Sequence, residues 1–421
     1  MLLDGISESA VVKIQELEES LAGRFAYFDE IGCYNQNKVL EAFSAVRVES
    51  RHFAPSTGYG YGDLSRDTLD ALFAQVFRAE AALVRPQFAN ATHALATALF
   101  AALRPGDEMV CATGPVYDTL RPVVGEGEES RGEGSLRDFG IGYHEIALAE
   151  STLAVDVDAL LRHIASRPRT RLVYLQRSGG YDWRPALSIG DLRRIIAEIR
   201  KNYPDMTVLV DNCYGEFVEA EEPLEAGADL IVGSLIKNPG GGLAPTGAYI
   251  AGRADLVEKA AFRLTVPGAG AEVGSYAASY LPFYQGLFLA PSAVNAALRG
   301  AALLAAAMES LGFALMPAPN AVRSDIIQAI RFGNREKLIA FCRCVQAASP
   351  VESHVTPEPW AMPGYADEVI MAAGTFIQGS SLEMTADAPI REPYIGYWQG
   401  GLTYAHCRIA VMRIYERLRS V

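Results

Sequence analysis

Short runs of apolar residues recur through the middle of the chain, separated by segments with helical spacing. The runs at 172–175 and 208–210 are continuous rather than alternating, which is typical of strands covered by helices on both faces. Helices are expected between the strands, at 92–103 and 189–202. Strands are expected at 81–85, 108–112, 171–176, 207–210 and 229–233. This alternation predicts an α/β fold whose sheet is mostly parallel and is flanked by helices.

The same patterns divide the chain into three parts. Residues 1–63 are expected to form a helical arm that ends in a loop rich in glycine and tyrosine, and residues 64–295 contain the α/β pattern. Residues 296–421 are expected to form a smaller α+β domain. A helix rich in alanine and leucine near 293–311 leads into this domain, and a helix at 404–419 ends it. A length of 421 residues suits two or three structural units.

One stretch of the chain raises the question of a membrane. No charged residue occurs between Glu272 and Arg299, and a segment of this length can cross a bilayer. Pro282 and Pro291 interrupt it, however, and a spanning helix would have to satisfy the freed backbone groups internally. We therefore expect a buried segment at an interface or near an active site rather than a membrane span.

The overall charge excludes some classes of partner. The chain has 37 Lys and Arg against 50 Asp and Glu, a formal net charge of −13. Binding to phosphate backbones and anionic lipids is driven by cationic side chains, so neither nucleic acid nor a membrane surface is an expected partner. The six cysteines show no C-x-x-C spacing, and the first thirty residues lack the apolar core of a signal peptide. The protein is expected to work in the cytoplasm.

Two residues with reactive side chains follow neighbouring strands of the predicted sheet. Asp211 comes directly after 207–210, and Lys237 comes shortly after 229–233. Ligands of open α/β sheets gather at the carboxyl ends of the strands, so both side chains are candidates for one site. Taken alone, the pair would also fit a simple salt bridge. The sharper interpretation is a pyridoxal phosphate site, because that cofactor needs a lysine for a Schiff base and a carboxylate that keeps its ring nitrogen protonated.

The other requirements of this cofactor are met in the right order along the chain. The turn at 90–93 leads into a helix N-terminus, which offers free N–H groups to a phosphate. Ser234 adds a hydroxyl, and Tyr117 follows a strand end, where its ring could cover the cofactor. His93 has no second histidine four residues later, so we expect a turn or packing residue rather than a metal ligand, and no metal is expected.

Ordered motifs along most of the chain match one known family. Besides the segments around Asp211 and Lys237, the matches lie at 58–61, 66–69, 92–95, 117–120, 133–136, 176–178, 180–181, 183–185, 386–392 and 399–404. On these motifs the chain, from about residue 53 to residue 418, resembles the fold-type I pyridoxal phosphate enzymes. Among them it is similar to the methionine gamma-lyase-like family, also known as aluminium resistance proteins. The resemblance implies a transferase-type fold with a seven-stranded sheet and a smaller C-terminal α+β domain.

The resemblance also implies roles for individual residues. Lys237 would hold pyridoxal phosphate and then act as the base at the substrate α-carbon, while Asp211 would pair with the ring nitrogen. Tyr117 would stack on the ring and assist proton transfer near the leaving group. Further cofactor contacts are implied for Asn90, Ala91, Thr92, Ser234, Gln176, Tyr59 and Tyr61. Substrate contacts are implied for Arg408, Arg177 and Tyr59. Arg408 would grip the α-carboxylate with a bidentate fork.

A second copy of the chain is implied as a partner. Tyr61, with Tyr59 beside it, lies where related enzymes reach across to the phosphate of the neighbouring copy. A homodimer or a dimer of dimers (a homotetramer), with shared active sites, is therefore expected. The chain departs from the family pattern at 90–91, which is Asn-Ala instead of Ser-Gly, at Gly179 in place of a basic residue, and at Arg408 in place of the more usual lysine.

The implied reaction is the cleavage of a carbon–sulfur bond in an amino acid. Lys237 would remove the α-proton, and a group would then leave from the γ- or β-carbon, as in methionine gamma-lyase. Burial and cationic neighbours are expected to lower the pKa of Lys237 toward the working range. The alternatives within the same fold are γ-replacement, aldol-type cleavage and transamination of a specialised amino acid.

Two further hypotheses come from other functional classes. The glycine-rich run at 268–274 suggests a dinucleotide-binding oxidoreductase. This run has one residue too many for the usual fingerprint, and it follows Pro267 rather than a clear strand. The other hypothesis is a catalytically silent binding protein that retained the fold. Tight binding of the cofactor without turnover would support that second hypothesis.

Overall fold

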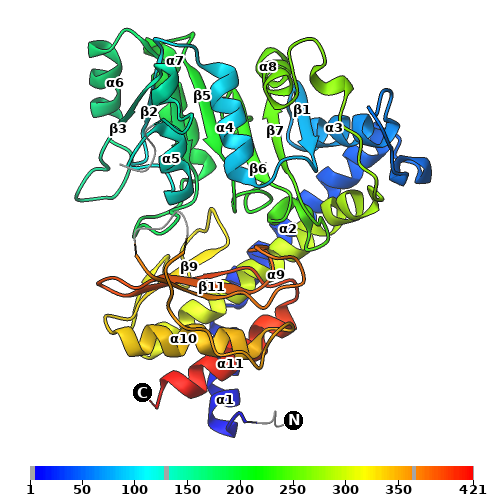
Figure 1. Cartoon of the computed structure of the whole chain (residues 1–421). Helices are drawn as coiled ribbons and strands as arrows, with labels where there is room; N and C mark the ends of the chain where they lie inside the picture. Colours follow the sequence, from blue (N-terminus) through cyan, green and yellow to red (C-terminus); the bar gives the residue numbers. More distant parts are fainter. Residues whose placement is uncertain (1–4, 128–131, 363–366, 421) are drawn as a thin grey trace.

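A seven-stranded sheet forms the core of the larger of two units (Figure 1). The computed structural model describes residues 5–127, 132–362 and 367–420. The strands of this sheet are β1 (Ala81–Arg85), β2 (Glu108–Cys111), β3 (Gly142–Glu145), β4 (Thr170–Gln176), β5 (Thr207–Asp211), β6 (Leu230–Ser234) and β7 (Ala248–Gly252). In the order β1-β7-β6-β5-β4-β2-β3, the strands from β6 to β3 pair in parallel, whereas β7 is antiparallel to both β6 and β1. The mostly parallel sheet is thus confirmed.

Alternate residues of the central strands enter two separate apolar cores. Val173 and Leu175 of β4 pack on the side of α7 (Ile189–Asn202), whereas Leu172 and Tyr174 pack on the side of α4 (Ala91–Ala102). Because both faces of the strand are buried, its apolar run is continuous. The remaining helices of this unit are α3 (Leu64–Val76), α5 (Arg121–Val124), α6 (Val157–Ser166) and α8 (Ala254–Leu264).

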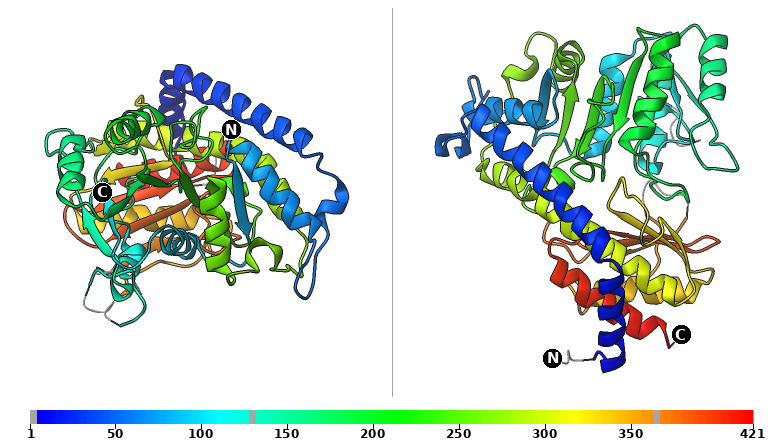
Figure 2. Two further views of the ribbon diagram at one scale, coloured as in Figure 1. Left: turned by 90° about the horizontal axis from the view of Figure 1, so that it is seen from above. Right: turned by 180° about the vertical axis from the view of Figure 1, so that it is seen from behind.

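A single long helix, α9 (Leu281–Ser310), links the larger unit to the smaller one (Figure 1). It is long and apolar enough to cross a membrane, yet 72% of its most apolar window is buried within the protein. The N-terminal arm consists of α1 (Glu8–Ser20) and α2 (Ala22–Ala45), and α2 runs alongside α9 (Figure 2). The uncharged stretch is therefore mostly a buried core helix. The expected domain boundary at 295/296 falls inside α9.

A five-stranded antiparallel sheet forms the smaller unit, in the order β10-β11-β12-β9-β8. Its strands are β8 (Ala314–Met316), β9 (Ile327–Arg331), β10 (Val369–Ala372), β11 (Thr385–Pro389) and β12 (Ile395–Gln399). The helix α10 (Arg335–Ala348) packs on this sheet and on the C-terminal helix α11 (Tyr404–Leu418). The smaller C-terminal α+β unit expected from the sequence is present.

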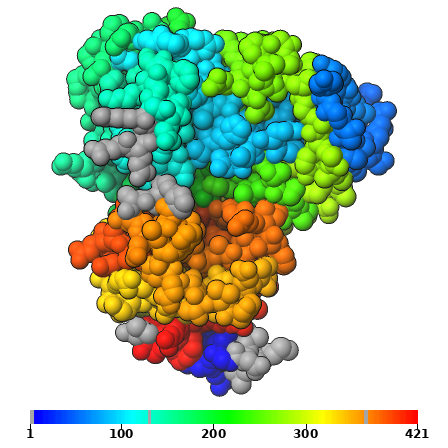
Figure 3. Space-filling view, in the orientation of Figure 1, coloured from blue at the N-terminus to red at the C-terminus, as the bar shows by residue number. Residues whose placement is uncertain are grey.

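The carboxyl ends of the parallel strands face the smaller sheet. Gln176 at the end of β4 is paired with Asp211 at the end of β5, and Asp211 is paired with Val232 of β6. The loops after these strands therefore open at one edge of the sheet. Figure 3 shows the cyan and green larger unit meeting the orange smaller unit at a waist, where this edge lies.

The glycine-rich run at 268–274 does not have the setting of a dinucleotide-binding turn. It follows the helix α8 rather than a strand, and it contains a 3-10 turn at Gly270–Glu272. The dinucleotide fingerprint needs a strand directly before the glycines and a helix that opens at them. The oxidoreductase interpretation is therefore wrong.

Candidate active site

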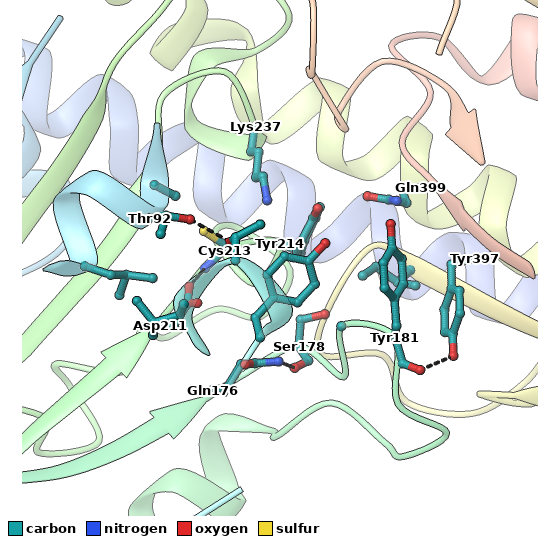
Figure 4. Close-up of a pocket in the computed structure, with 17 residues that line it drawn as sticks. Thr92, Gln176, Ser178, Tyr181, Asp211, Cys213, Tyr214, Lys237, Tyr397 and Gln399 are labelled. Atoms are coloured by element: carbon teal, nitrogen blue, oxygen red, sulfur yellow. Dashed lines mark hydrogen bonds between the residues drawn. The ribbon is translucent and has the colours of Figure 1, made fainter. Parts of the chain in front are cut away.

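A pocket with an open volume of about 660 Å³ lies between the two units (Figure 4). The larger unit contributes residues at strand ends and at one helix start, and the smaller unit contributes Ile327, Tyr397 and Gln399. The structure brings six of the sequence-predicted site residues together in this wall: Ala91, Thr92, Tyr117, Gln176, Asp211 and Lys237.

Lys237 reaches into the pocket from the turn that follows β6 (Figure 4). Its Nζ atom lies 3.8 Å from the centroid of the Tyr214 ring. Within the described chain no carboxylate oxygen lies within 4.0 Å of Nζ, so a simple salt bridge with Asp211 is not formed. The ammonium is therefore buried against a phenol ring and forms no close ion pair with a carboxylate.

The expected lowering of the pKa of Lys237 is wrong for this arrangement. Burial lowers the pKa, but Tyr214, Cys213 and Asp211 together raise it by more, so that it lies above its ordinary value. The expectation assumed cationic neighbours. The structure places the arginines of the neighbouring motifs elsewhere, and the groups that face Lys237 carry negative charge when ionised.

Asp211 ends β5 and presents its carboxylate to the pocket (Figure 4). Its two oxygens accept hydrogen bonds from the Tyr174 hydroxyl at 3.2 Å and from the Cys213 N–H at 3.1 Å. The side chain is buried, at 7% exposure. Two donors and a strand end hold the carboxylate in one orientation, which suits an acceptor for a protonated ring nitrogen.

The N-terminus of α4 forms another part of the pocket wall. Ala91 and Thr92 line the pocket, and the first N–H groups of a helix have no partner within the helix. Asn90 is the N-cap, and its side-chain oxygen accepts from the His93 N–H at 2.8 Å. Asn90 is thus engaged in capping the helix and does not line the pocket. Ser234, at the end of β6, is buried but does not line it either.

A glycine opens the space between two predicted cofactor contacts. A Cβ atom at Gly180 would lie 3.0 Å from Cδ2 of Tyr117 and 3.1 Å from Nε2 of Gln176, and the φ angle of +59° disfavours other residues. The Gln176 amide nitrogen donates to the Ser178 carbonyl oxygen at 3.0 Å, whereas its buried Oε1 has no partner. Gly180 therefore leaves space beside the Tyr117 ring and the Gln176 amide, and the amide keeps one acceptor without a partner.

A family model named methionine gamma-lyase matches residues 10–419 of the chain. The chain belongs to the methionine gamma-lyase family. The YnbB protein of Bacillus subtilis (strain 168) is 47% identical over 420 residues, which is 99% of each chain. The solved structure of a carbon-sulfur lyase involved in aluminum resistance from Clostridium novyi NT is 46% identical, with a TM-score of 0.94, and covers 99% of this chain and 100% of that one. The resemblance inferred from the motifs is confirmed.

The fold of this member of the methionine gamma-lyase family extends to more distant proteins. The pyridoxal-5'-phosphate dependent protein YhfS from Escherichia coli is 17% identical, with a TM-score of 0.62, and covers 94% of this chain and 97% of that one. This likeness concerns the fold, which is the fold-type I arrangement expected from the sequence.

The family implies pyridoxal phosphate, and the residues present fit that group. The pocket holds one lysine, a carboxylate fixed by two donors, and a helix N-terminus for a phosphate. It also holds the unpartnered Gln176 oxygen, which can accept from a ring hydroxyl, and the Tyr117 ring beside the space left by Gly180. These features supply the complementary partner for each polar group of the cofactor.

Arg177 does not reach the substrate side of the pocket in this member of the methionine gamma-lyase family. It is fully buried, and its guanidinium donates to the Asn212 side chain at 2.8 Å, the Gly215 carbonyl oxygen at 2.9 Å and Glu219 at 2.9 Å. Successive side chains of an extended segment point in opposite directions, so Arg177 points away where Gln176 faces the pocket. Arg177 therefore does not form the substrate contact that the resemblance implied, and its role is structural.

Arg408 is also far from its implied place. It lies on α11, does not line the pocket, and its Nε donates to both oxygens of Glu18 on α1, at 2.7 and 2.8 Å. Arg408 therefore does not bind a substrate carboxylate as expected. Its contact with Glu18 links the C-terminal helix to the N-terminal arm.

Replacing Arg408 by methionine is expected to leave the KM for an amino-acid substrate unchanged within about twofold, since the pair with Glu18 lies outside the pocket. The two side chains are 32% and 19% exposed, so the loss of free energy of unfolding should be about 1 kcal/mol or less. Urea unfolding and steady-state kinetics measure the two effects. A tenfold rise in KM would contradict this placement.

Tyr59 and Tyr61 lie outside the pocket of their own chain. They are 75% and 71% exposed, and their ring centroids are 5.6 Å apart. Their loop is nevertheless held in place, since Ser275 donates to the Gly58 carbonyl oxygen at 2.8 Å and the Gly274 N–H donates to the Tyr59 carbonyl oxygen at 3.0 Å. Two aromatic rings are thus displayed to solvent from an anchored loop.

Sequence reasoning assigned no role to several pocket residues. They are aromatic or amide side chains from both units: Tyr181, Tyr214, Tyr397 and Gln399. Tyr214 follows Asp211 by three residues, so the strand-end rule could have identified it. Tyr397 and Gln399 share one face of β12, and their approach to the larger unit depends on contacts remote in sequence.

Asp387 is a further carboxylate beside the pocket. It lies on β11 and accepts a hydrogen bond from Nε2 of Gln399 at 2.7 Å. Burial raises the pKa of Asp387 to about 6, although Gln399, Lys237 and Tyr181 each act to lower it. The folded chain therefore binds this proton more tightly than the unfolded chain does.

Because of this raised pKa, the free energy of unfolding of the cofactor-free protein is expected to depend on pH. The contribution of Asp387 is complete below the unfolded pKa of ~3.9 and is lost as the pH rises through about 6. Relative to Asp387→Asn, the free energy of unfolding of the wild type should fall by about 2–3 kcal/mol between pH 4 and pH 7. Urea unfolding of both proteins across this range is the measurement. A difference that does not vary with pH would show that Asp387 titrates normally.

Proposed function

We propose that the protein is a pyridoxal phosphate-dependent lyase that cleaves a carbon–sulfur bond at the γ- or β-carbon of an amino acid. The observation that carries this proposal is the convergence of Lys237, Asp211 and the N-terminus of α4 on one pocket, in a chain of the methionine gamma-lyase family. The sequence-similar structure described as a carbon-sulfur lyase supports the bond that is broken.

The chain's own residues would divide the chemistry as follows. When bound, pyridoxal phosphate supplies an aldehyde for amino groups and a ring that accepts electrons from the substrate α-carbon. Asp211 would hold a proton at the ring nitrogen, and Ala91 and Thr92 would bind the phosphate through the helix start. Lys237 would take the proton from the α-carbon and deliver it where the product needs it.

The remaining walls favour an apolar substrate side chain. Tyr117, Tyr181, Tyr397 and Ile327 surround the space beyond Lys237, and they would exclude water from the reacting carbon atoms. Tyr117 lines this space, and its hydroxyl would give a proton to the departing sulfur. A thioether such as that of methionine suits these walls.

Product analysis tests this proposal. Protein reconstituted with pyridoxal phosphate is incubated with L-methionine, L-homocysteine and L-cystathionine, and release of α-keto acid, ammonia and thiol is measured. We expect equal amounts of keto acid and thiol from at least one of these amino acids. Keto acid without thiol, or without hydrogen sulfide in the case of L-homocysteine, would favour transamination instead. A cofactor absorption band with no product from any of them would favour a silent binding protein.

We also infer that two copies of the chain form each complete site. The anchored loop displays Tyr59 and Tyr61 to solvent. Val266 and Leu281, which precede and follow in sequence the residues 274–275 that hold this loop, are exposed apolar residues as well. An aromatic loop of this kind suits burial against a second copy, where Tyr61 would reach the phosphate of that copy. A homodimer or a dimer of dimers would bury these side chains.

Mixing two inactive variants is expected to restore activity. If Lys237 and Tyr61 of one site come from different copies, Lys237→Ala and Tyr61→Ala proteins that exchange subunits form hybrids with one intact site. Random exchange should recover about a quarter of the wild-type rate. Sedimentation of each variant confirms the assembly. No recovery from variants that sediment as dimers and exchange subunits would contradict the shared site.

We place the protein in the cytoplasm. All six cysteines are free thiols in the structure, and four of them are buried. This is the state that a reducing compartment maintains. Fractionation of cells that express the tagged chain tests the placement.

A further inference from the structure

A second cavity, of about 440 Å³, adjoins the active-site pocket. The two share Gly180, Ile327 and Tyr397 in their walls, so they are separated by single side chains. We call the second one the arginine cavity, because Arg184 and Arg323 both line it. The residues that would carry out the proposed reaction line the first pocket, and neither Arg184 nor Arg323 is among them.

Arg323 is a buried cation that is only partly satisfied by the chain. It is 3% exposed, and its terminal nitrogens donate to the Gln328 side-chain oxygen at 2.6 Å and to the Ile327 carbonyl oxygen at 3.4 Å. Its Nε–H is buried and has no hydrogen-bond partner. Leaving a charged donor unpaired in the interior is costly, so such a group indicates a missing acceptor.

Arg184 shows the same pattern from the opposite unit. It is 5% exposed, and its terminal nitrogens donate to the carbonyl oxygens of Gln176, Ser178 and Pro185. Its Nε–H is also buried without a partner. Two arginines, one from each unit, thus line the same cavity, and each keeps one buried Nε–H without a hydrogen-bond partner.

Two acidic side chains, Asp182 and Asp325, also line the cavity, but neither forms a close ion pair with the arginines. In the described residues, no carboxylate oxygen lies within 4.0 Å of either guanidinium. Asp325, the buried acid of the cavity, accepts from the Ser178 hydroxyl at 2.9 Å and from the Ile327 N–H at 3.1 Å. Burial lowers the pKa of both arginines, and it outweighs the opposing effect of Asp182 and Asp325 on Arg184 and of Asp325 on Arg323.

The active-site pocket itself lacks what an amino-acid substrate needs. Among the residues that line it, Lys237 is the sole cation, and Lys237 is required for the cofactor and the α-proton. The two arginines that the family resemblance offered, Arg177 and Arg408, are held by Glu219 and Glu18. A substrate carboxylate therefore has no arginine partner among these pocket residues.

We propose that the arginine cavity binds a carboxylate of the amino-acid substrate, with Arg323 and Arg184 as its donors. This inference rests on the proposed function, because it assumes that an amino acid occupies the adjoining pocket. Arginine is suited to this task since its fork matches the two oxygens of a carboxylate. Binding would also join the two units through one ligand, because Arg184 belongs to the larger unit and Arg323 to the smaller one.

Two carboxylates are compatible with this chemistry: the α-carboxylate, or a second carboxylate at the far end of a longer substrate. Holoenzyme is titrated with three amino acids that carry no sulfur, and the change in the visible absorption of the cofactor gives each Kd. L-norleucine has only the α-carboxylate, L-norleucinamide has none, and L-2-aminoadipate has both. The proteins compared are the wild type, Arg323→Met, Arg323→Lys and, as a control, Arg335→Met on the exposed start of α10.

We expect Arg323→Met to bind L-2-aminoadipate about 10- to 100-fold more weakly than the wild type does, the range for a lost charge-assisted hydrogen bond. Arg323→Lys should recover part of this affinity, and Arg335→Met should match the wild type. An equal loss for L-norleucine identifies the α-carboxylate, whereas unchanged norleucine binding identifies the distal one. L-norleucinamide should bind to the Arg323 variants and the wild type alike.

Equal affinities of Arg323→Met and the wild type for both acids would overturn the inference. A wild type that binds L-norleucinamide and both acids equally well would overturn it too, without any variant. If Arg323→Met fails to fold, this wild-type comparison together with Arg323→Lys decides the matter. A wild-type holoenzyme whose absorption responds to no amino acid would instead overturn the proposed function, and this inference with it.

Discussion

Lys237→Ala protein is expected to lose about 10⁴-fold or more in the rate of carbon–sulfur cleavage. Lys237 is the single lysine in the pocket wall, and no other basic side chain there can take its place at the substrate α-carbon. The protein should also lose the absorption band that borohydride removes from the wild type. Rapid-quench assays and absorption spectra of the same samples measure both effects.

Lys259→Ala is the matched control, since Lys259 lies on α8 with 45% of its side chain exposed and pairs only with Asp255. It should behave like the wild type. The substitution also removes the contact of the ammonium with the Tyr214 ring and its attraction to Asp211, so thermal unfolding of the cofactor-free Lys237→Ala chain is measured in parallel. Activity that survives in a stable Lys237→Ala protein would refute the assignment of the base.

Asp211→Asn is expected to lower the turnover number by about 100- to 1,000-fold, the usual cost of removing one preorganised electrostatic group. Asparagine has nearly the same shape and can still accept from the Cys213 N–H, so the loop after β5 should keep its position. It carries no negative charge, however, and would not hold a proton on the ring nitrogen. The electron-accepting capacity of the cofactor would fall.

The control for this substitution is Asp205→Asn, an exposed position in the turn before β5. It changes the same chemical group on the same strand connection and should leave turnover unaffected. Thermal unfolding of both variants separates loss of function from loss of fold. If Asp211→Asn retains turnover within tenfold of the wild type, the ring nitrogen is not the partner of Asp211.

The strands of the larger sheet were predictable where both faces are buried. β4 and β5 are runs of apolar residues in the sequence, and their predicted positions agree with the structure to within a residue. β3 and β7 were not predicted. β3 is an edge strand whose residues are partly exposed, and it includes His144 and Glu145. β7 follows the glycines at 240–242, and its apolar run is short, because Tyr249 and Ile250 are its only large apolar residues.

The site residues likewise fall into two groups: those that a local sequence pattern identifies, and those whose position depends on contacts remote in sequence. Asp211 and Lys237 are found from sequence because the end of a strand is a local feature. The direction of Arg177 needed the exact end of β4, and the place of Arg408 depended on which face of the predicted helix at 404–419 packs against α1. The approach of Gln399 to Lys237 joins residues far apart in the chain, and no local pattern encodes it.

The unbroken course of α9 has a mechanical consequence for the pocket. Since one continuous helix enters both units and α2 lies against it, the larger and smaller sheets cannot rotate apart about a flexible linker. The helix α9 then fixes the distance between the two walls of the pocket, and this distance limits the length of the substrate that fits. Substitutions along α9 can alter which amino acids fit without touching any residue that contacts them.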